Sequence, residues 1–159
     1  MKKNVLETRR QVASAVICDY PGGRECAAAR LGMPLKKFDN HLYENAGSRP
    51  LTDDQIVQLE KDAGTTHLPD YIAAQYGGVF VKLDEAGNLD NIDLYTFAVN
   101  TSTKRGLVDQ IIAKALEDGV VDESEIAQIL AAHRQHMSAR CTEVYSVIAL
   151  HSKPSGSRH

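Results

Sequence analysis

The 159-residue chain has no tryptophan and only 6% aromatic residues, so aliphatic side chains must supply most of any core. Its 43% of hydrophobic residues is nevertheless enough to bury one. The three cysteines, Cys18, Cys26 and Cys141, lack the paired spacing of a metal site, and their odd number argues against a disulfide framework. We therefore expect reduced thiols, with Cys18 and Cys26 as small core residues on apolar helix faces, and we expect no metal and no other cofactor.

Long apolar runs are also absent. No segment approaches the roughly 18 apolar residues of a membrane span. The basic start at Met1–Lys3 is followed by Glu7, Arg9 and Arg10 instead of the apolar run of a signal peptide. The sequence therefore predicts a cytoplasmic protein without a membrane partner.

Patterns typical of catalysis are missing as well. No serine lies in a Gly-x-Ser-x-Gly setting, and the two glycine pairs lack the long pattern of a nucleotide-binding loop. His133 and His136 are three residues apart, but no Glu or Cys lies at a matching helical distance. We predict no catalytic residue and no metal ligand, so the chain is not expected to be an enzyme.

The most informative segment is 24–43, which predicts two short helices joined at Gly32. Ala27, Ala28 and Leu31 form a small apolar face, and Gly32 follows where a helix end favours left-handed backbone angles. Met33 can fill the corner, and Pro34 suits the start of a second helix. This pattern is typical of a helix-turn-helix, although any corner between two helices in a small helical protein is an alternative.

In the second helix, Leu35, Phe38 and Leu42 form the apolar stripe, and polar residues occupy the other faces. Lysines and an amide on such a helix are suited to phosphates and base edges in a major groove. A loop at 45–50 could add a phosphate contact. The predicted DNA-binding residues are Arg24, Lys36, Lys37, Asn40, Ser48 and Arg49.

The net charge of −3 is unevenly distributed. Residues 1–50 carry nine Lys or Arg against five Asp or Glu, a net of +4, whereas residues 51–159 carry nine against sixteen, a net of −7. This asymmetry indicates that the N-terminal part meets a polyanion.

The remaining pattern predicts an all-α protein. Five helices are expected within 1–83, as in repressor-type DNA-binding domains: about Val5–Tyr20, the two corner helices, one opened by a Thr52–Gln55 capping box and ending near Gly64, and one from Thr66 or His67. Val79–Leu83 is β-prone, and the polar, turn-like 84–88 marks the domain boundary. In the helical region 84–151 we expect a short element at 91–99, a helix at 103–118 and a last helix capped by Asp122 or Ser124; 152–159 is predicted to be a disordered tail.

The last helix has an apolar seam spaced nearly as heptads, and it is long enough to outreach a small domain. We predict that the seam holds a homo-oligomer, a dimer or tetramer, as a helical bundle; packing of the helix against 103–118 in a hairpin is the alternative, and both can hold together. The predicted oligomerisation residues are Ile126, Leu130, Met137, Cys141, Val144 and Ile148.

Several motifs together resemble a known family. They are Tyr20-Pro-Gly-Gly-Arg24, Gly32-Met33 with Phe38, Asn40 and Leu42, the Arg49–Ile56 helix start, and Leu68–Gln75. In this order they resemble the regulatory CII proteins of P2-like temperate phages and of cryptic prophages, over roughly residues 10–80. One departure is that Leu42 lies four residues after Phe38, where many repressor helices have three.

The resemblance implies a transcription factor of the lysis–lysogeny decision that binds repeated operator half-sites in double-stranded DNA as an oligomer. Its expected partners are the operator, further copies of itself and, as a further candidate, host RNA polymerase. The competing hypothesis is a non-enzymatic prophage adaptor that binds a host protein through its acidic C-terminal half.

Overall fold

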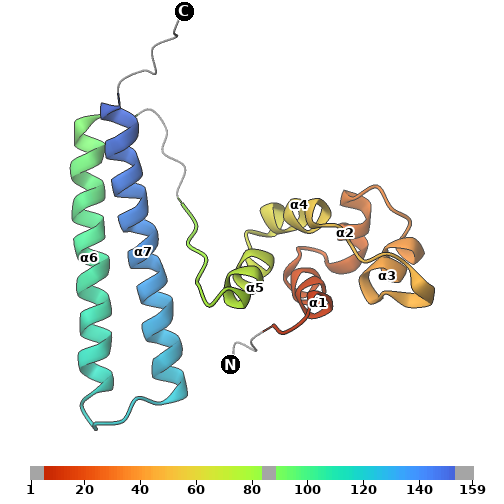
Figure 1. Ribbon diagram of the computed structural model, residues 1–159, viewed down its shortest axis with the longest axis horizontal. Coiled ribbons are helices and arrows are strands. Elements are labelled where there is room, and N and C mark those ends of the chain that lie inside the picture. Colours follow the sequence, from red (N-terminus) through yellow and green to blue (C-terminus); the bar gives the residue numbers. More distant parts are fainter. Residues whose placement is uncertain (1–5, 84–88, 153–159) are drawn as a thin grey trace, which may run out of the picture. The chain divides into compact units, whose positions relative to one another are not determined.

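The computed structural model describes residues 6–83 and 89–152, which form seven α-helices and one 3-10 helix and contain no strand (Figure 1). The all-α prediction is therefore confirmed, and the β-prone Val79–Leu83 is not in a strand. Residues 84–88, and 153–159 of the predicted tail, lie outside the described residues. The chain divides between Phe80 and Val81 into two compact units.

The first unit contains five α-helices joined by short connections. They are α1 (Arg9–Asp19), α2 (Gly23–Arg30), α3 (Leu35–Tyr43), α4 (Asp53–Ala63) and α5 (His67–Gln75), with the 3-10 helix η1 (Asn45–Gly47) between α3 and α4. The predicted capping box at Thr52–Gln55 and the glycine end at Gly64 are confirmed. Helix α1 starts later than predicted because Thr8 caps it, accepting a hydrogen bond from the backbone N–H of Gln11.

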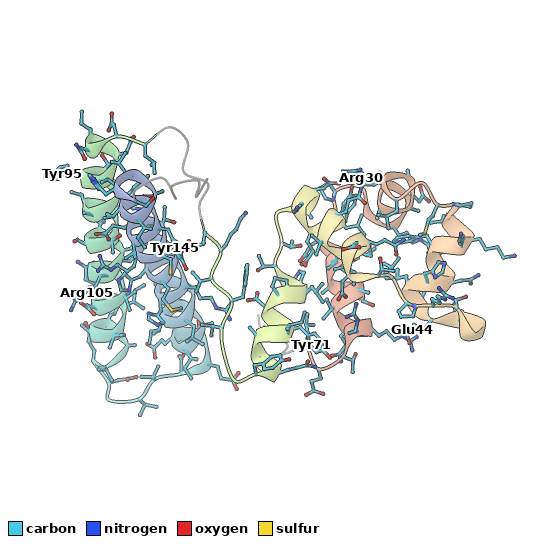
Figure 2. The ribbon with its side chains drawn as sticks, turned by 45° about the horizontal axis from the view of Figure 1, so that its top comes forward. Arg30, Glu44, Tyr71, Tyr95, Arg105 and Tyr145 are labelled. Atoms are coloured by element: carbon cyan, nitrogen blue, oxygen red, sulfur yellow. The ribbon has the colours of Figure 1, made fainter. Side chains whose placement is uncertain are left out.

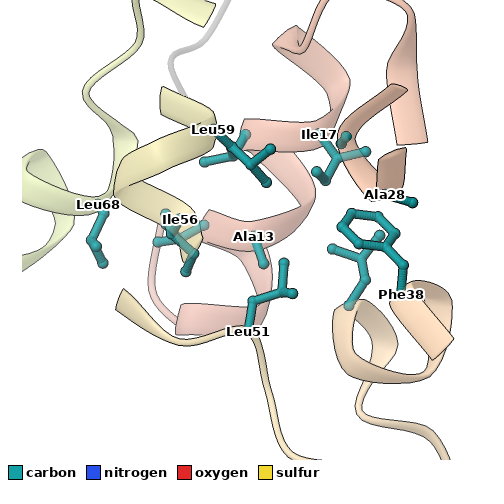
Figure 3. Close-up of a cluster of buried hydrophobic side chains, with 12 residues drawn as sticks. Ala13, Ile17, Ala28, Phe38, Leu51, Ile56, Leu59 and Leu68 are labelled. Carbon is teal, nitrogen blue, oxygen red and sulfur yellow. The ribbon is translucent and has the colours of Figure 1, made fainter. Parts of the chain in front are cut away.

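The core of this unit lies around α1 (Figure 3). Val12 and Val16 of α1 are at most 1% exposed, and Phe38 of α3 and Leu59 of α4 are fully buried. The prediction that Cys18 and Cys26 belong to the core is wrong, because both thiols are exposed. The buried face of α1 consists of Val12, Ala13, Val16 and Ile17, which leaves Cys18 on the outside.

A buried carboxylate joins α4 to α5. Glu60 is only 4% exposed, and its side chain accepts hydrogen bonds from the Thr65 hydroxyl at 3.1 Å, from the backbone N–H of His67, and from that of Leu68 at 3.1 Å. The two amides belong to the first turn of α5, where backbone N–H groups have no partner within the helix. Glu60 therefore fixes where α5 begins.

The second unit is an antiparallel hairpin of α6 (Asn91–Ala115) and α7 (Glu123–His151) (Figure 1). The prediction of two elements before residue 118 is wrong, because α6 runs unbroken through 100–102. The hydroxyl groups of Thr101 and Thr103 donate to the carbonyls of Phe97 and Val99, each at 2.9 Å, so these polar side chains are satisfied within the helix. The predicted cap of α7 at Asp122 is confirmed.

No helix among the described residues combines the length and the apolar character that a membrane crossing requires.

Candidate nucleic-acid interface

The corner between α2 and α3 has a well-defined backbone. Gly32 adopts a left-handed φ of 64°, its N–H donates to the carbonyl of Ala29 at 3.0 Å, and the N–H of Met33 donates to that of Ala28 at 2.9 Å. These two hydrogen bonds form the Schellman ending of α2. Pro34 precedes the first residue of α3, and its carbonyl accepts from the N–H of Phe38 at 3.0 Å. The angle between the helices is thus set by backbone hydrogen bonds.

The buried residues of α3 determine which of its side chains face outward. Phe38 is 0% and Leu42 2% exposed, so the spacing of four residues places both in the core. At about 100° per residue, the opposite face contains Lys36, Asn40 and Tyr43. Lys36 and Tyr43 are exposed and Asn40 is half-buried. These three side chains form what we call the α3 outer face.

Arg24 flanks the α3 outer face on one side. It belongs to the first turn of α2, and its guanidinium is 3.3 Å from a carboxylate oxygen of Asp39 on α3. The Asp39 side chain is 24% exposed and that of Arg24 50%, so the ion pair lies at the edge of the corner. It compensates the one negative charge on this side of α3 and leaves Arg24 accessible to solvent.

Arg49 reaches the other side of α3 through the loop that follows it. Glu44 ends the helix with a left-handed φ of 53° (Figure 2), and η1 then turns the chain back. His41 of α3 donates a hydrogen bond from its Nδ1 to the carbonyl of Arg49. Arg49 is exposed, whereas Ser48 is half-buried. Of the predicted residues, Lys37 is also exposed, beside the α3 outer face.

An ion pair connects this corner to α4. The Arg30 guanidinium donates to an oxygen of Asp62 at 2.6 Å, and the Tyr20 hydroxyl donates to the same oxygen at 3.3 Å. The hydrogen bond from Arg30 lowers the pKa of Asp62, and the same bond raises the pKa of Arg30. Burial, followed by the nearby charge of Asp62, raises the pKa of Tyr20. The end of α2 is therefore held to α4 by charge-assisted hydrogen bonds.

Two residues of the candidate interface were not predicted from the sequence. Tyr43 lies seven residues after Lys36 and three after Asn40, a helical spacing that could have identified it. Asp39 could be found only from its contact with Arg24, because residues 15 apart are not neighbours on one helix and the contact depends on how α2 and α3 pack.

The predicted oligomerisation seam lies on α7, and four of its large apolar residues are exposed. Ile126 is 46%, Leu130 52%, Val144 39% and Ile148 55% exposed. Met137 and Cys141 are half-buried. The predicted alternative, a hairpin with the preceding helix, is present, and it uses other residues of α7.

Comparison with known proteins gives two results. The family described as phage regulatory protein CII (CP76) matches residues 8–147. A protein of Escherichia coli (strain K12), "Uncharacterized protein YmfL", is 33% identical over 109 residues, which cover 69% of this chain and 58% of that protein. The chain thus spans somewhat more than half the length of this relative.

Proposed function

Because the chain belongs to the phage regulatory protein CII (CP76) family, we propose that it is a DNA-binding transcriptional regulator of a phage or prophage lysis–lysogeny switch. It binds specific double-stranded sites in the host cytoplasm, as a homo-oligomer on repeated half-sites. The observation that carries this proposal is the α3 outer face, which presents Lys36, Asn40 and Tyr43 to solvent on a helix anchored by Phe38 and Leu42. In this proposal, α2 and α3 are the two helices of a helix-turn-helix.

The α3 outer face reads base edges in the major groove. The Asn40 carboxamide can donate to and accept from adenine in a bidentate pair, and Lys36 or Lys37 can donate to guanine. Tyr43 has a hydroxyl group at the C-terminal end of the same face and extends the row of possible contacts. The exposed width of one helix allows only a few base contacts for each copy of the chain.

Backbone contacts come from both flanks of α3. Arg24 is exposed beside Asp39, and Arg49 is exposed beside His41. Cations at these positions meet phosphates and fix the register of the helix without reading sequence. Ser48, in the same loop as Arg49, adds a neutral donor.

Association of several copies supplies the preference for the operator over other DNA that one helix cannot provide. Two or more units on repeated half-sites multiply the number of base contacts. The uncovered seam of α7, from Ile126 to Ile148, supports this part of the proposal because large apolar side chains are exposed along it.

A gel-shift series across salt concentrations tests the proposal, with fragments of the chain's own genomic neighbourhood as probes. The proposal expects one preferred fragment and a steep fall of affinity with salt, because Lys and Arg side chains that bind phosphates displace the counterions of DNA. Absence of salt-dependent retention on any fragment would favour the adaptor hypothesis. The net charge of −7 over residues 51–159 would then mark the part that binds a host protein.

A further inference from the structure

The two faces of α7 differ in the size of their side chains. The face toward α6 contains the buried Ala132, Ala139, Thr142 and Ser146. The buried residues of α6 are Thr101, Val108 and Ala115, again seven residues apart. The most deeply buried positions of the hairpin thus carry small side chains, with Val108 the largest of them, and larger residues such as Phe97 and Ile129 are half-buried.

The apolar seam lies on the other side of α7. At about 100° per residue, the middle of the seam lies roughly 150° around the helix axis from Ala139. Ile126, Leu130, Val144 and Ile148 lie in that direction and are exposed. The Ser138 hydroxyl donates a hydrogen bond to the backbone carbonyl of Lys82 at 2.5 Å, but Ser138 lies on the flank between the two faces. Met137 at the middle of the seam is half-buried, and the buried residues of α7 are all small.

The spacing of the seam residues is symmetric about the middle of the seam. Its members are Ile126, Leu130, His133, Met137, Cys141, Val144 and Ile148, with spacings of 4, 3, 4, 4, 3 and 4 residues. This order reads the same from either end, with Met137 in the middle. A second α7 laid antiparallel over the first therefore presents a seam of identical spacing.

We infer that α7 pairs with α7 of a second copy in antiparallel orientation, across a two-fold axis at Met137. This inference rests on the proposed homo-oligomer and specifies its interface. Ile126 then meets Ile148 of the second copy, Leu130 meets Val144, and His133 meets Cys141. Each residue pair occurs twice, as an isologous interface requires. With α6 on the other side of each α7, the assembly is a layer of four helices.

Charge favours the antiparallel orientation over the parallel one. The antiparallel register sets the carboxylate of Glu123 beside the imidazole of His151 at both ends of the seam. A parallel register would set Glu123 beside Glu123 and His133 beside His133. Arg140 approaches Arg134 of the second copy in the antiparallel register, but its charge is already compensated by Glu143 at 2.9 Å. The seam between Ile126 and Ile148 is about 33 Å long, comparable to a short coiled coil.

Disulfide crosslinking distinguishes the two registers. The starting protein is the full chain with Cys18→Ser and Cys26→Ser, which retains Cys141 as its single cysteine. Antiparallel pairing separates the two Cys141 residues by about eight helical positions, or ~12 Å along the axis. A disulfide needs Cα atoms within about 7 Å, so this protein should remain uncrosslinked under mild oxidation.

Two further variants of the starting protein should crosslink. Adding His133→Cys places the new thiol opposite Cys141 of the second copy, and we expect most of the protein to run as a covalent dimer. Met137→Cys, with Cys141→Ser, puts one cysteine on the two-fold axis and should crosslink equally well; because residue 137 would also meet itself in a parallel register, this result indicates the antiparallel one only together with an uncrosslinked Cys141. Far-UV circular dichroism checks that each variant retains its helices, and Met137→Cys serves as the second test if His133→Cys perturbs folding.

The outcomes separate this inference from the proposed function. Crosslinking of Cys141 alone, or a dimer in which neither new cysteine crosslinks, would overturn the antiparallel register and leave DNA binding untouched. A monomer by light scattering at micromolar concentration would overturn both this inference and the proposed homo-oligomer. If the intact chain bound no genomic fragment in gel shifts while the expected crosslinks formed, only the proposed DNA-binding function would be overturned.

Discussion

Replacing Glu60 by Ala should destabilise the first unit more than any other change to a charged residue in it. The side chain is 4% exposed and accepts hydrogen bonds from Thr65, His67 and Leu68. Truncation leaves these donors without an acceptor beneath the start of α5. Each buried unsatisfied group costs about 1–3 kcal/mol, and since part of this region can admit water we expect a total of about 2–4 kcal/mol. Glu60→Gln retains one acceptor oxygen and should lose about half as much.

Native-state hydrogen exchange measures this loss in the full chain. Amides of α1 and α4 should exchange roughly 30- to 900-fold faster in Glu60→Ala, because a tenfold change corresponds to about 1.4 kcal/mol. Amides of α6 and α7 should not change. Lys61→Ala, an exposed neighbour on α4, is the matched control and should stay within about 0.5 kcal/mol. Equal exchange rates in Glu60→Ala and Lys61→Ala would refute the assigned role of Glu60.

Three other changes test the packing and electrostatics of the first unit. Phe38→Ala should cost about 3–5 kcal/mol in denaturant unfolding, whereas Tyr43→Ala, on the outer face of the same helix, should cost under about 1 kcal/mol; similar losses would contradict the assigned rotation of α3. The pKa of Asp62 is lowered below its ordinary 3.8, so its pairing with Arg30 stabilises the fold above that pH and the contribution is lost as the pH falls through the folded pKa. Asp62→Asn should therefore flatten the acid limb of the stability profile, and an unchanged limb would be the contrary result. Thr52→Ala removes the cap of α4 and should lower the unfolding free energy by about 0.5–2 kcal/mol, with no change counting against the capping box.

The first unit was largely predictable because its signals are local. Gly32 and Pro34 mark the corner, and Thr52 and Gln55 mark the start of α4, through interactions between residues at most five apart. Long-range contacts were not predictable. The pairing of Arg24 with Asp39 and the capping of α5 by Glu60 depend on how helices pack, and no spacing rule connects those residues.

The second unit was only partly predictable, because small residues do not stand out in an apolar pattern. The large residues of α7 form the visible seam, yet Ala132, Ala139 and Ser146 make its contact with α6. Likewise the polar stretch around Thr101 suggested an interruption, although its hydroxyl bonds to the preceding turn and the residue is buried in α6.

The Asn40→Ala variant shows whether the α3 outer face reads DNA sequence. Affinity is measured by fluorescence anisotropy for the preferred genomic fragment and for a scrambled fragment of equal length, at one fixed salt concentration. We expect a loss of about 1–3 kcal/mol on the preferred fragment and none on the scrambled one, because Asn40 contacts a base and not the backbone. Arg49→Ala should instead weaken binding to both fragments equally. An equal loss on both fragments for Asn40→Ala would contradict the account.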